Sequence, residues 1–153
     1  MKIRNAKKDD ISNILELSVR FCEIDFLDYR DMEVMKERQK RLSEKSIETN
    51  FSNIYIAESD NKFLGYLEMS KEKDYFTQKD IAYIKAIAVN LNAERQGVGK
   101  QLMKKAKEWC IENNCTELVL DVFSGNKKAI NFYNNLGFEI EIIKMVVTVQ
   151  LTL

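Results

Sequence analysis

The segment Arg95–Lys100, Arg-Gln-Gly-Val-Gly-Lys, combines two glycines with two cations, a composition suited to binding an anion. An apolar stretch predicts a buried strand just before it, and helical periodicity begins at Gly97. Free N–H groups and the positive dipole end at a helix start attract phosphate, and glycine lets phosphate oxygens approach the backbone. Glycines that only permit a tight strand-to-helix turn explain the loop equally well. The residues expected to bind the anion are Arg95, Gln96, Gly97, Val98, Gly99 and Lys100.

Two common nucleotide-binding motifs are excluded by the residues around this loop. A P-loop requires glycine five residues before Gly99 and Ser or Thr after Lys100, but the chain has Glu94 and Gln101 there. A dinucleotide-binding fingerprint requires glycine three residues after Gly99, where the chain has Leu102. The loop therefore indicates an anionic ligand bound in another way.

A second segment, Asn126–Phe138, follows with the sequence Asn-Lys-Lys-Ala-Ile-Asn-Phe-Tyr-Asn-Asn-Leu-Gly-Phe. With the first segment it resembles the GNAT-type N-acetyltransferase superfamily, in which a strand with Ile-Ala-Val, a Gln/Arg-x-x-Gly-x-Gly/Ala loop and an Asn-x-x-Ala-x-x-Phe-Tyr-x-x-x-Gly-Phe helix recur together. The resemblance spans roughly residues 81–138. Either motif alone is weak, but the ordered pair is specific. One departure is Glu94, where the superfamily usually has Gln or Arg, and its carboxylate should repel phosphate.

The resemblance implies transfer of an acetyl group from acetyl-CoA directly to an amine, without an acyl-enzyme. It assigns the thioester to backbone groups of the strand residues Ile87, Ala88 and Val89, where fixed donors suit a developing oxyanion. It also implies that Asn126 hydrogen-bonds the coenzyme and that Tyr133 protonates the leaving thiolate. These two residues are seven apart, two turns along one helix face. The alternative for Tyr133 is an aromatic ring that only packs.

The acceptor amine must lose a proton before it attacks. A lysine-like amine has a pKa near ~10.4, so deprotonation at neutral pH costs roughly 4–5 kcal/mol, against about 1 kcal/mol for an α-amine. Some relatives place a glutamate early on the fourth strand, where this chain has Tyr83. Glu68, on the preceding strand, is the candidate base, acting directly or through water. The alternative is an exposed strand carboxylate.

The stretch Glu23–Asp31 contains four carboxylates among aromatic residues and falls where the superfamily builds its acceptor wall. Such a stretch could attract a cationic amine, such as a polyamine or a lysine side chain. The alternative is a solvated connection between two helices.

The elements that must position these residues follow from hydrophobic periodicity and turn signals. Their order, β-α-α-β-β-β-α-β-α-β-β, predicts an α/β (α+β) fold with a mixed, mostly antiparallel sheet of six to seven strands and helices on both faces. The chain has no proline, linker or repeat, which predicts a single domain over residues 1–153. The expected strands are Lys2–Ala6, Asn53–Glu58, Lys62–Met69, Ile81–Asn90, Thr116–Phe123, Phe138–Ile143 and Met145–Leu153. The expected helices are residues 11–22, Asp31–Thr49, Gly97–Asn113 and Asn126–Leu136.

Composition excludes several classes of function. Histidine is absent, which removes Ser-His-Asp and Cys-His catalysis and His-ligated metal sites, so we expect no metal. The 24 basic and 24 acidic residues cancel, which argues against nucleic acid and anionic membranes as partners. With neither a membrane-length apolar run nor a signal-peptide core, we expect a cytoplasmic protein. Cys22, Cys110 and Cys115 lack CxxC spacing and are expected to be buried, reduced thiols.

Two other functions stay open on the sequence alone. One is a catalytically silent acyl-CoA-binding sensor or interaction module, against which Tyr133 and the glycine pair argue. The other is a structural or partner-binding domain that uses the strand Met145–Leu153, and this strand could also form a homodimer. The acceptor is an amine of a small molecule or of a peptide, and the sequence does not choose between them.

Overall fold

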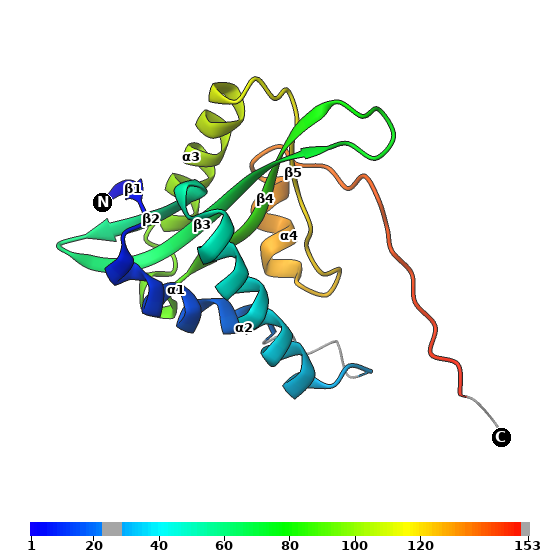
Figure 1. Cartoon of the computed structure of the whole chain (residues 1–153). Coiled ribbons are helices and arrows are strands. Elements are labelled where there is room, and N and C mark those ends of the chain that lie inside the picture. Colours follow the sequence, from blue (N-terminus) through cyan, green and yellow to red (C-terminus); the bar gives the residue numbers. More distant parts are fainter. Residues whose placement is uncertain (23–28, 151–153) are drawn as a thin grey trace.

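The computed structural model describes residues 1–22 and 29–150, so most of the predicted acceptor wall, at residues 23–28, lies outside the described residues. Four α-helices and five strands make up the regular structure of the described part (Figure 1). The strands are β1 (Lys2–Asn5), β2 (Ile54–Ser59), β3 (Lys62–Lys73), β4 (Asp80–Val89) and β5 (Leu118–Leu120). The α-helices are α1 (Ile11–Ser18), α2 (Met32–Thr49), α3 (Val98–Glu112) and α4 (Lys127–Asn134).

The sheet follows chain order, β1-β2-β3-β4-β5, and is mixed as predicted. The first three pairings are antiparallel and only β4 and β5 run parallel. The β2–β3 hairpin turns at Asp60 and Asn61, whose φ angles of 51° and 59° are those that a tight two-residue turn requires. Asx residues tolerate this left-handed conformation, so the turn was predictable from its residues.

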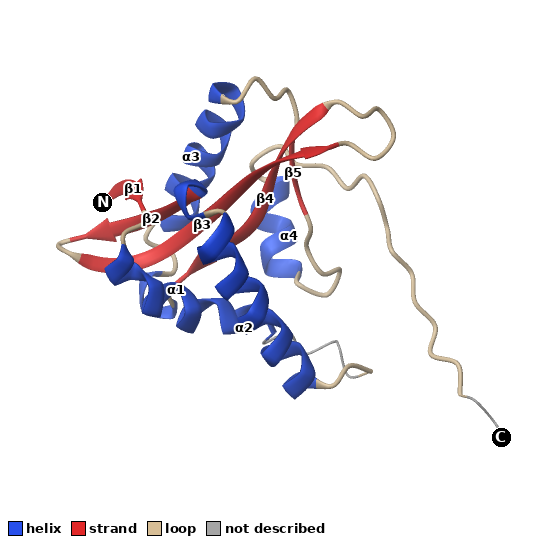
Figure 2. Cartoon of the chain, viewed as in Figure 1, coloured by secondary structure: helices blue, strands red, loops and turns tan. Residues whose placement is uncertain are grey.

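Helices cover both faces of the sheet, with α1 and α2 on one face and α3 and α4 on the other (Figure 2). Strand alternation decides which side chains meet which helices. In β3, Leu67 and Met69 pack in the α3 cluster, whereas Tyr66 packs with Ile14 and Leu17 of α1. The functional segments identified from the sequence therefore belong to a core on both faces of the sheet, whose central strand is β3 with β4 beside it.

The predicted strands at the C-terminal end are wrong for the described residues. Residues 138–150 form no strand, and β5 has three residues in place of the predicted Thr116–Phe123, so the sheet has five strands and not six or seven. The physical reason lies in strand pairing. Alternation of apolar and polar residues shows that a sequence can form a strand, but a strand also needs a neighbouring strand to accept and donate its backbone hydrogen bonds. In the described part of the chain, β5 has β4 as its only neighbour.

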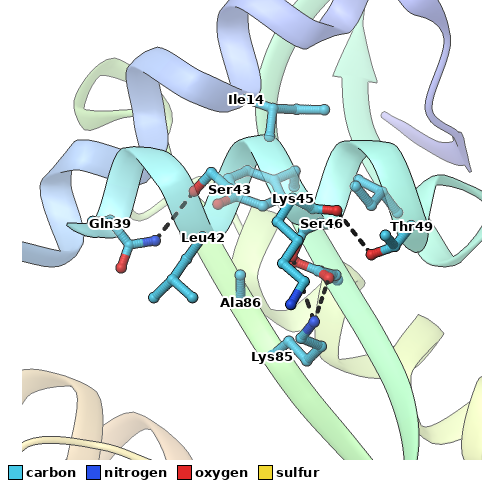
Figure 3. Close-up of a pocket in the computed structure, with 12 residues that line it drawn as sticks. Ile14, Gln39, Leu42, Ser43, Lys45, Ser46, Thr49, Lys85 and Ala86 are labelled. Carbon is cyan, nitrogen blue, oxygen red and sulfur yellow. Dashed lines mark hydrogen bonds and ion pairs between the residues drawn. The ribbon is translucent and has the colours of Figure 1, made fainter. Parts of the chain in front are cut away.

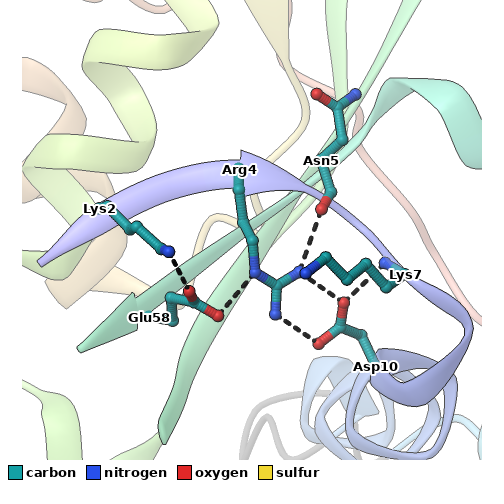
Figure 4. Close-up of polar contacts among 6 residues, drawn as sticks. All are labelled: Lys2, Arg4, Asn5, Lys7, Asp10 and Glu58. Carbon is teal, nitrogen blue, oxygen red and sulfur yellow. Dashed lines mark hydrogen bonds and ion pairs between the residues drawn. The ribbon is translucent and has the colours of Figure 1, made fainter. Parts of the chain in front are cut away.

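A polar network holds β1 to its surroundings (Figure 4). Arg4 donates from Nη1 to Asp10 Oδ2 at 2.7 Å and from Nη2 to Asp10 Oδ1 at 3.0 Å. Its Nε donates to Glu58 Oε2 at 2.6 Å, and Lys2 Nζ lies 3.0 Å from Glu58 Oε1. The network joins β1, the turn that enters α1, and the end of β2.

Candidate active site

The loop before α3 has the geometry of an anion cradle. Gly97 is the N-cap of α3 with φ 81°, and it supplies no side-chain cap. The first intrahelical bond of this end runs from Gln101 N to Gly97 O at 3.1 Å, so the N–H groups of residues 98–100 have no acceptor inside the helix. A Cβ added to Gly97 would meet nothing within 4 Å, which leaves the approach to these donors open.

Gly99 has a packing role that the motif did not indicate. A Cβ built at this position would lie 3.2 Å from Phe132 Cζ, closer than ordinary contact allows. The second glycine of the loop thus permits α4 to pack closely against the start of α3. This contact places the two predicted coenzyme segments beside each other.

The C-terminal half of β4 has a free edge. β4 pairs with β5 only at residues 82–84, and the β3–β4 register shifts where Glu68 pairs with Ala86 and Met69 with Ile84, which leaves Lys85 as an extra residue. Bulges of this kind bend a strand and end pairing. Beyond the bulge, the described residues of β4 pair with β3 alone.

The backbone of Val89 points toward this free edge, because its carbonyl accepts from Nη1 of Arg20. The next residue, Asn90, donates its N–H to Leu64 O on the β3 side at 2.8 Å. Since amides two residues apart in a strand point the same way, Ile87 also directs its backbone groups away from β3. Ala88, between them, points toward β3.

Glu94 is compensated by two cations. Its carboxylate accepts from Nζ of Lys128, at the start of α4, and from Nη2 of Arg20 at 3.3 Å. These cations, with Lys128 the larger influence, hold the pKa of Glu94 below its usual range. The carboxylate of Glu94 is therefore part of a charged cluster that joins three segments. The sequence alone led us to expect that this carboxylate would repel phosphate, and in the structure the two cations offset its negative charge.

Asn126 caps α4, and Tyr133 lies two turns further along the helix. The Asn126 Oδ1 accepts from Ala129 N at 3.1 Å. The Tyr133 ring packs between Phe132 and Phe138, at centroid distances of 5.4 and 5.7 Å, and burial raises the pKa of its hydroxyl. Within the described residues, neither this hydroxyl nor the Nδ2 group of Asn126 has a hydrogen-bond partner.

Glu68 lies on the other face of the sheet and is 5% exposed, so the alternative of an exposed strand carboxylate is wrong. Its Oε1 accepts from Asn50 Nδ2 at 2.9 Å and lies 3.2 Å from Lys85 Nζ. The carboxylate lines a cavity of about 270 Å³ between α2 and the β3–β4 pair (Figure 3). Because Tyr133 packs in the α3 cluster, the structure does not place these two predicted side chains together on one face.

Sequence reasoning missed the partners of the predicted residues. Tyr83, at the position where the resemblance to the superfamily implies a glutamate in some members, donates its hydroxyl to Asp121 just after β5, and burial is the main cause that raises its pKa. The partners come from segments distant in sequence and carry no motif. They are Arg20 and Lys128 at Glu94, Asn50 and Lys85 at Glu68, and Asp121 at Tyr83.

Other predictions concern metals, thiols and membranes. Among residues 1–22 and 29–150, no three His, Cys, Asp or Glu side chains gather in a way that could hold a metal ion. The predicted reduced and buried thiols are confirmed at Cys22, Cys110 and Cys115. None of the helices described here is both long and apolar enough to cross a bilayer.

Comparison with known proteins agrees with this geometry. The chain is 27% identical to an uncharacterized N-acetyltransferase of Bacillus subtilis, YhfO, over 91% of this chain and 90% of that protein. It is 28% identical to N-alpha-acetyltransferase 30 of Dictyostelium discoideum, over 88% and 78% of the two chains. It is also 27% identical to the thialysine N-epsilon-acetyltransferase of Sus scrofa, over 88% and 82%.

Solved structures show the same fold. A protein of Pyrococcus furiosus, named provisionally as an acetyl transferase, matches with a TM-score of 0.81 and 25% identity over 97% of this chain and 99% of that one. AAC(6')-Iy, bound to the bisubstrate analog CoA-S-monomethyl-acetylneamine, matches with a TM-score of 0.70 and 19% identity over 97% of each chain. Residues 14–138 match the sequence profile of the acetyltransferase (GNAT) family, so this chain belongs to that family and is an N-acetyltransferase.

Proposed function

We propose that the protein transfers the acetyl group of acetyl-CoA to a primary amine by direct attack in a ternary complex. The observation that carries the proposal is the juxtaposition of two backbone surfaces, the N-terminus of α3 and the edge of β4 beyond Ile84, which has no strand partner in the described residues. The first suits a pyrophosphate and the second suits an extended amide-containing chain. Coenzyme A contains both.

The cradle uses the N–H groups of residues 97–100, with Arg95, Gln96 and Lys100 around it. The backbone groups of Ile87 and Val89, with Ala88 between them, hold the pantetheine arm and thioester. The free Nδ2 of Asn126 donates to the coenzyme, while its Oδ1 keeps capping α4. This division lets one side chain serve both the helix and the ligand.

The departing thiolate receives its proton from Tyr133. Burial raises the pKa of this hydroxyl, so it remains protonated at neutral pH and can act as an acid. The coenzyme thiol has an ordinary pKa near ~8.5, so its anion gains from a positioned donor. The hydroxyl lacks a protein partner in the described residues, which leaves it available for this bond.

The cavity beside Glu68 is proposed to receive the acceptor. It includes Lys85 and Ala86, which directly precede the thioester-binding stretch of β4. Glu68 would accept the amine proton directly or through water. The names of the relatives include an α-amine and an ε-amine acetyltransferase, both acting on primary amines, which supports this acceptor class.

Calorimetry with acetyl-CoA in EDTA tests the coenzyme site. We expect binding without a metal, because the donors are backbone amides and cations. Gly97→Glu should abolish binding, since its carboxylate would enter the open space before the amides. Gly97→Ala is the matched control, because both variants carry the strain of φ 81°, about 1 kcal/mol, but only one adds charge. Unchanged affinity in Gly97→Glu would place the cradle elsewhere.

Turnover of acetyl-CoA with a panel of α-amino peptides, lysine analogues, polyamines and aminoglycosides tests the transfer itself. We expect at least one primary amine to be acetylated and free thiol to appear in equal amount. Tight acetyl-CoA binding without transfer to any amine would favour a silent acyl-CoA-binding module.

A further inference from the structure

The cavity between α2 and the β3–β4 pair is small, and short side chains are the reason that it exists (Figure 3). α2 contributes Ser43 and Ser46, which are both buried, where a helix that covers a sheet usually contributes large apolar side chains. Ala86 of β4 adds only a methyl group. The volume of about 270 Å³ lies below the roughly 300–1,000 Å³ of pockets for drug-sized ligands, so the cavity suits a small molecule.

The charges around the cavity do not match a ligand that carries only amines. Among the described residues that line it, the charged ones are Glu68, Lys45 and Lys85, two cations against one carboxylate. Glu68 is already paired with Lys85 at 3.2 Å, and Lys45 has no ion-pair partner in the described part of the chain. An ammonium ion that approached Glu68 would meet these like charges in a partly buried site, where salt screens them little.

The cavity also offers a hydrogen-bond donor that no protein group uses. Tyr66 is 2% exposed, and its hydroxyl has no partner in the described residues. This oxygen is not among the buried atoms that lack a hydrogen bond, so it opens onto the cavity that Tyr66 lines. Burial, with a smaller effect from the charge of Glu68, raises the pKa of the hydroxyl and keeps it protonated. A free donor beside two ammonium groups favours a ligand with an anionic acceptor.

We propose that the acceptor is a small amino acid, bound with its amine at Glu68 and its carboxylate at Lys85. The inference rests on the proposed function, because it names the amine that the cavity receives. A bound zwitterion lets the ion pair exchange partners, with Lys85 turning to the carboxylate of the ligand and Glu68 to its ammonium group. Every charge of this pair then keeps an opposite neighbour, while Lys45 and Tyr66 offer the carboxylate further donors.

The transfer then balances without a further reactant. The ammonium group gives one proton to Glu68, the neutral nitrogen forms a bond to the thioester carbonyl carbon, and the carbon–sulfur bond breaks. The thiolate takes a proton from Tyr133, and the second amine proton restores the Tyr133 hydroxyl through water. The products are the N-acetylated amino acid, coenzyme A and one proton, which leaves Glu68 for solvent.

Matched acceptors test the need for a carboxylate. Lysine and cadaverine differ only in the α-carboxylate, and each common amino acid has an α-amide that lacks its charge. With saturating acetyl-CoA, kcat/KM for the preferred amino acid should exceed that of its amide roughly 10- to 100-fold, the effect of one charged hydrogen bond. If amides, cadaverine or aminoglycosides were acetylated as efficiently as the acids, the inference would be overturned while the transfer itself would stand.

Lysine variants test which residues recognise the carboxylate. Lys85→Met should lower the ratio of kcat/KM for acid over amide about tenfold, and Lys85→Arg should keep the preference. Lys45→Met, at an exposed position with little influence on folding, should lower the ratio by a smaller factor. Lys40→Met, on α2 but outside the cavity, is the matched control. A purely structural role would change both acceptors equally, so an unchanged ratio in Lys85→Met and Lys45→Met would contradict the inference.

Calorimetry separates a failure of this inference from a failure of the proposed function. Amino acids and their amides are titrated into the protein saturated with coenzyme A, which carries no acetyl group to transfer. Tighter binding of an acid than of its amide, lost in Lys85→Met, would support the inference even if no amine were acetylated, and only the proposed function would then fail. Equal binding of acid and amide, or no binding of any acid, would overturn the inference.

Discussion

The Tyr133 hydroxyl combines a half-buried ring with a donor that has no partner in the described residues. The hydroxyl is not among the buried atoms that lack a hydrogen bond, so it reaches solvent, where a water molecule can bond to it until a ligand replaces that water. Its neighbours Phe132 and Phe138 provide only ring contacts. The ring is therefore held in place by packing alone, and the hydroxyl is free to bond to a ligand. This arrangement distinguishes Tyr133 from a tyrosine whose only role is to fill the core.

Tyr133→Phe should lower kcat by about 10²–10⁴-fold, because general acid catalysis contributes on that order. The ring packing is retained and no protein hydrogen bond is lost, so the free energy of unfolding should change by less than about 0.5 kcal/mol. Single-turnover kinetics and calorimetry would separate the chemical step from acetyl-CoA affinity, which should stay the same. Tyr75→Phe, at an exposed position, is the control. Wild-type single-turnover rates would leave Tyr133 with a packing role only.

At the scale of elements, Glu94 joins three segments that contribute to the candidate site. Arg20 follows α1, Lys128 lies in the first turn of α4, and both reach the carboxylate in the loop before α3. The position of the loop therefore depends on charges from both faces of the sheet. A carboxylate at this position is compatible with a phosphate site only while these cations compensate it.

Lys128→Met should weaken acetyl-CoA binding about 1.4- to fivefold, because it unmasks the charge of Glu94 beside the proposed anion site. This range corresponds to the roughly 0.2–1 kcal/mol of an exposed ion pair. Adding Glu94→Gln should restore most of the affinity, and both effects should shrink in high salt. Calorimetry of acetyl-CoA binding to wild type, the two single variants and the double variant gives a double-mutant cycle for the Lys128–Glu94 pair. An additive double variant would mean that Lys128 acts without Glu94.

Local patterns predicted most elements, and tertiary pairing decided the rest. The β2–β3 hairpin, α2 with its Asp31 cap, and α3 after Gly97 follow from turn residues, capping and periodicity. The motif pair likewise located the loop and α4. By contrast, the packing role of Gly99 and the pairing of Glu94 depend on side chains more than 30 residues away. No local pattern contains that information.

The same distinction applies to the residues near the C-terminal end. Residues 138–150 have the alternation of a strand, and the structure shows them unpaired. Whether a sequence capable of forming a strand becomes one depends on an available edge, and in the described residues no strand pairs with this segment. Alternation alone therefore predicts more strands than the described part of the chain contains.

At the scale of the whole molecule, the edge strand β1 is held largely by charge. Arg4 links it to Asp10 and Glu58, and these contacts hold the pKa of both carboxyl groups below their usual range. The largest influence on the pKa of Asp10 is its hydrogen bond from Arg4, and the largest influence on the pKa of Glu58 is its hydrogen bond from Lys2. A carboxyl group with a lowered pKa in the folded state stabilises that state above its unfolded pKa, near ~4. This contribution disappears as the pH falls through the lower, folded pKa.

Urea unfolding between pH 7 and pH 2.5 tests this coupling. Wild type should lose stability steeply below about pH 4, where the carboxyl groups must be protonated on unfolding. Asp10→Asn should lower the free energy of unfolding by about 2 kcal/mol at pH 7, the value of a charged hydrogen bond, and should flatten the acid limb. Asp9→Asn, at the exposed neighbouring residue, is the matched control and should keep the wild-type profile. If Asp10→Asn kept the full acid dependence, the carboxyl groups that govern acid unfolding would lie away from β1, and the Arg4 network would hold the strand by geometry alone.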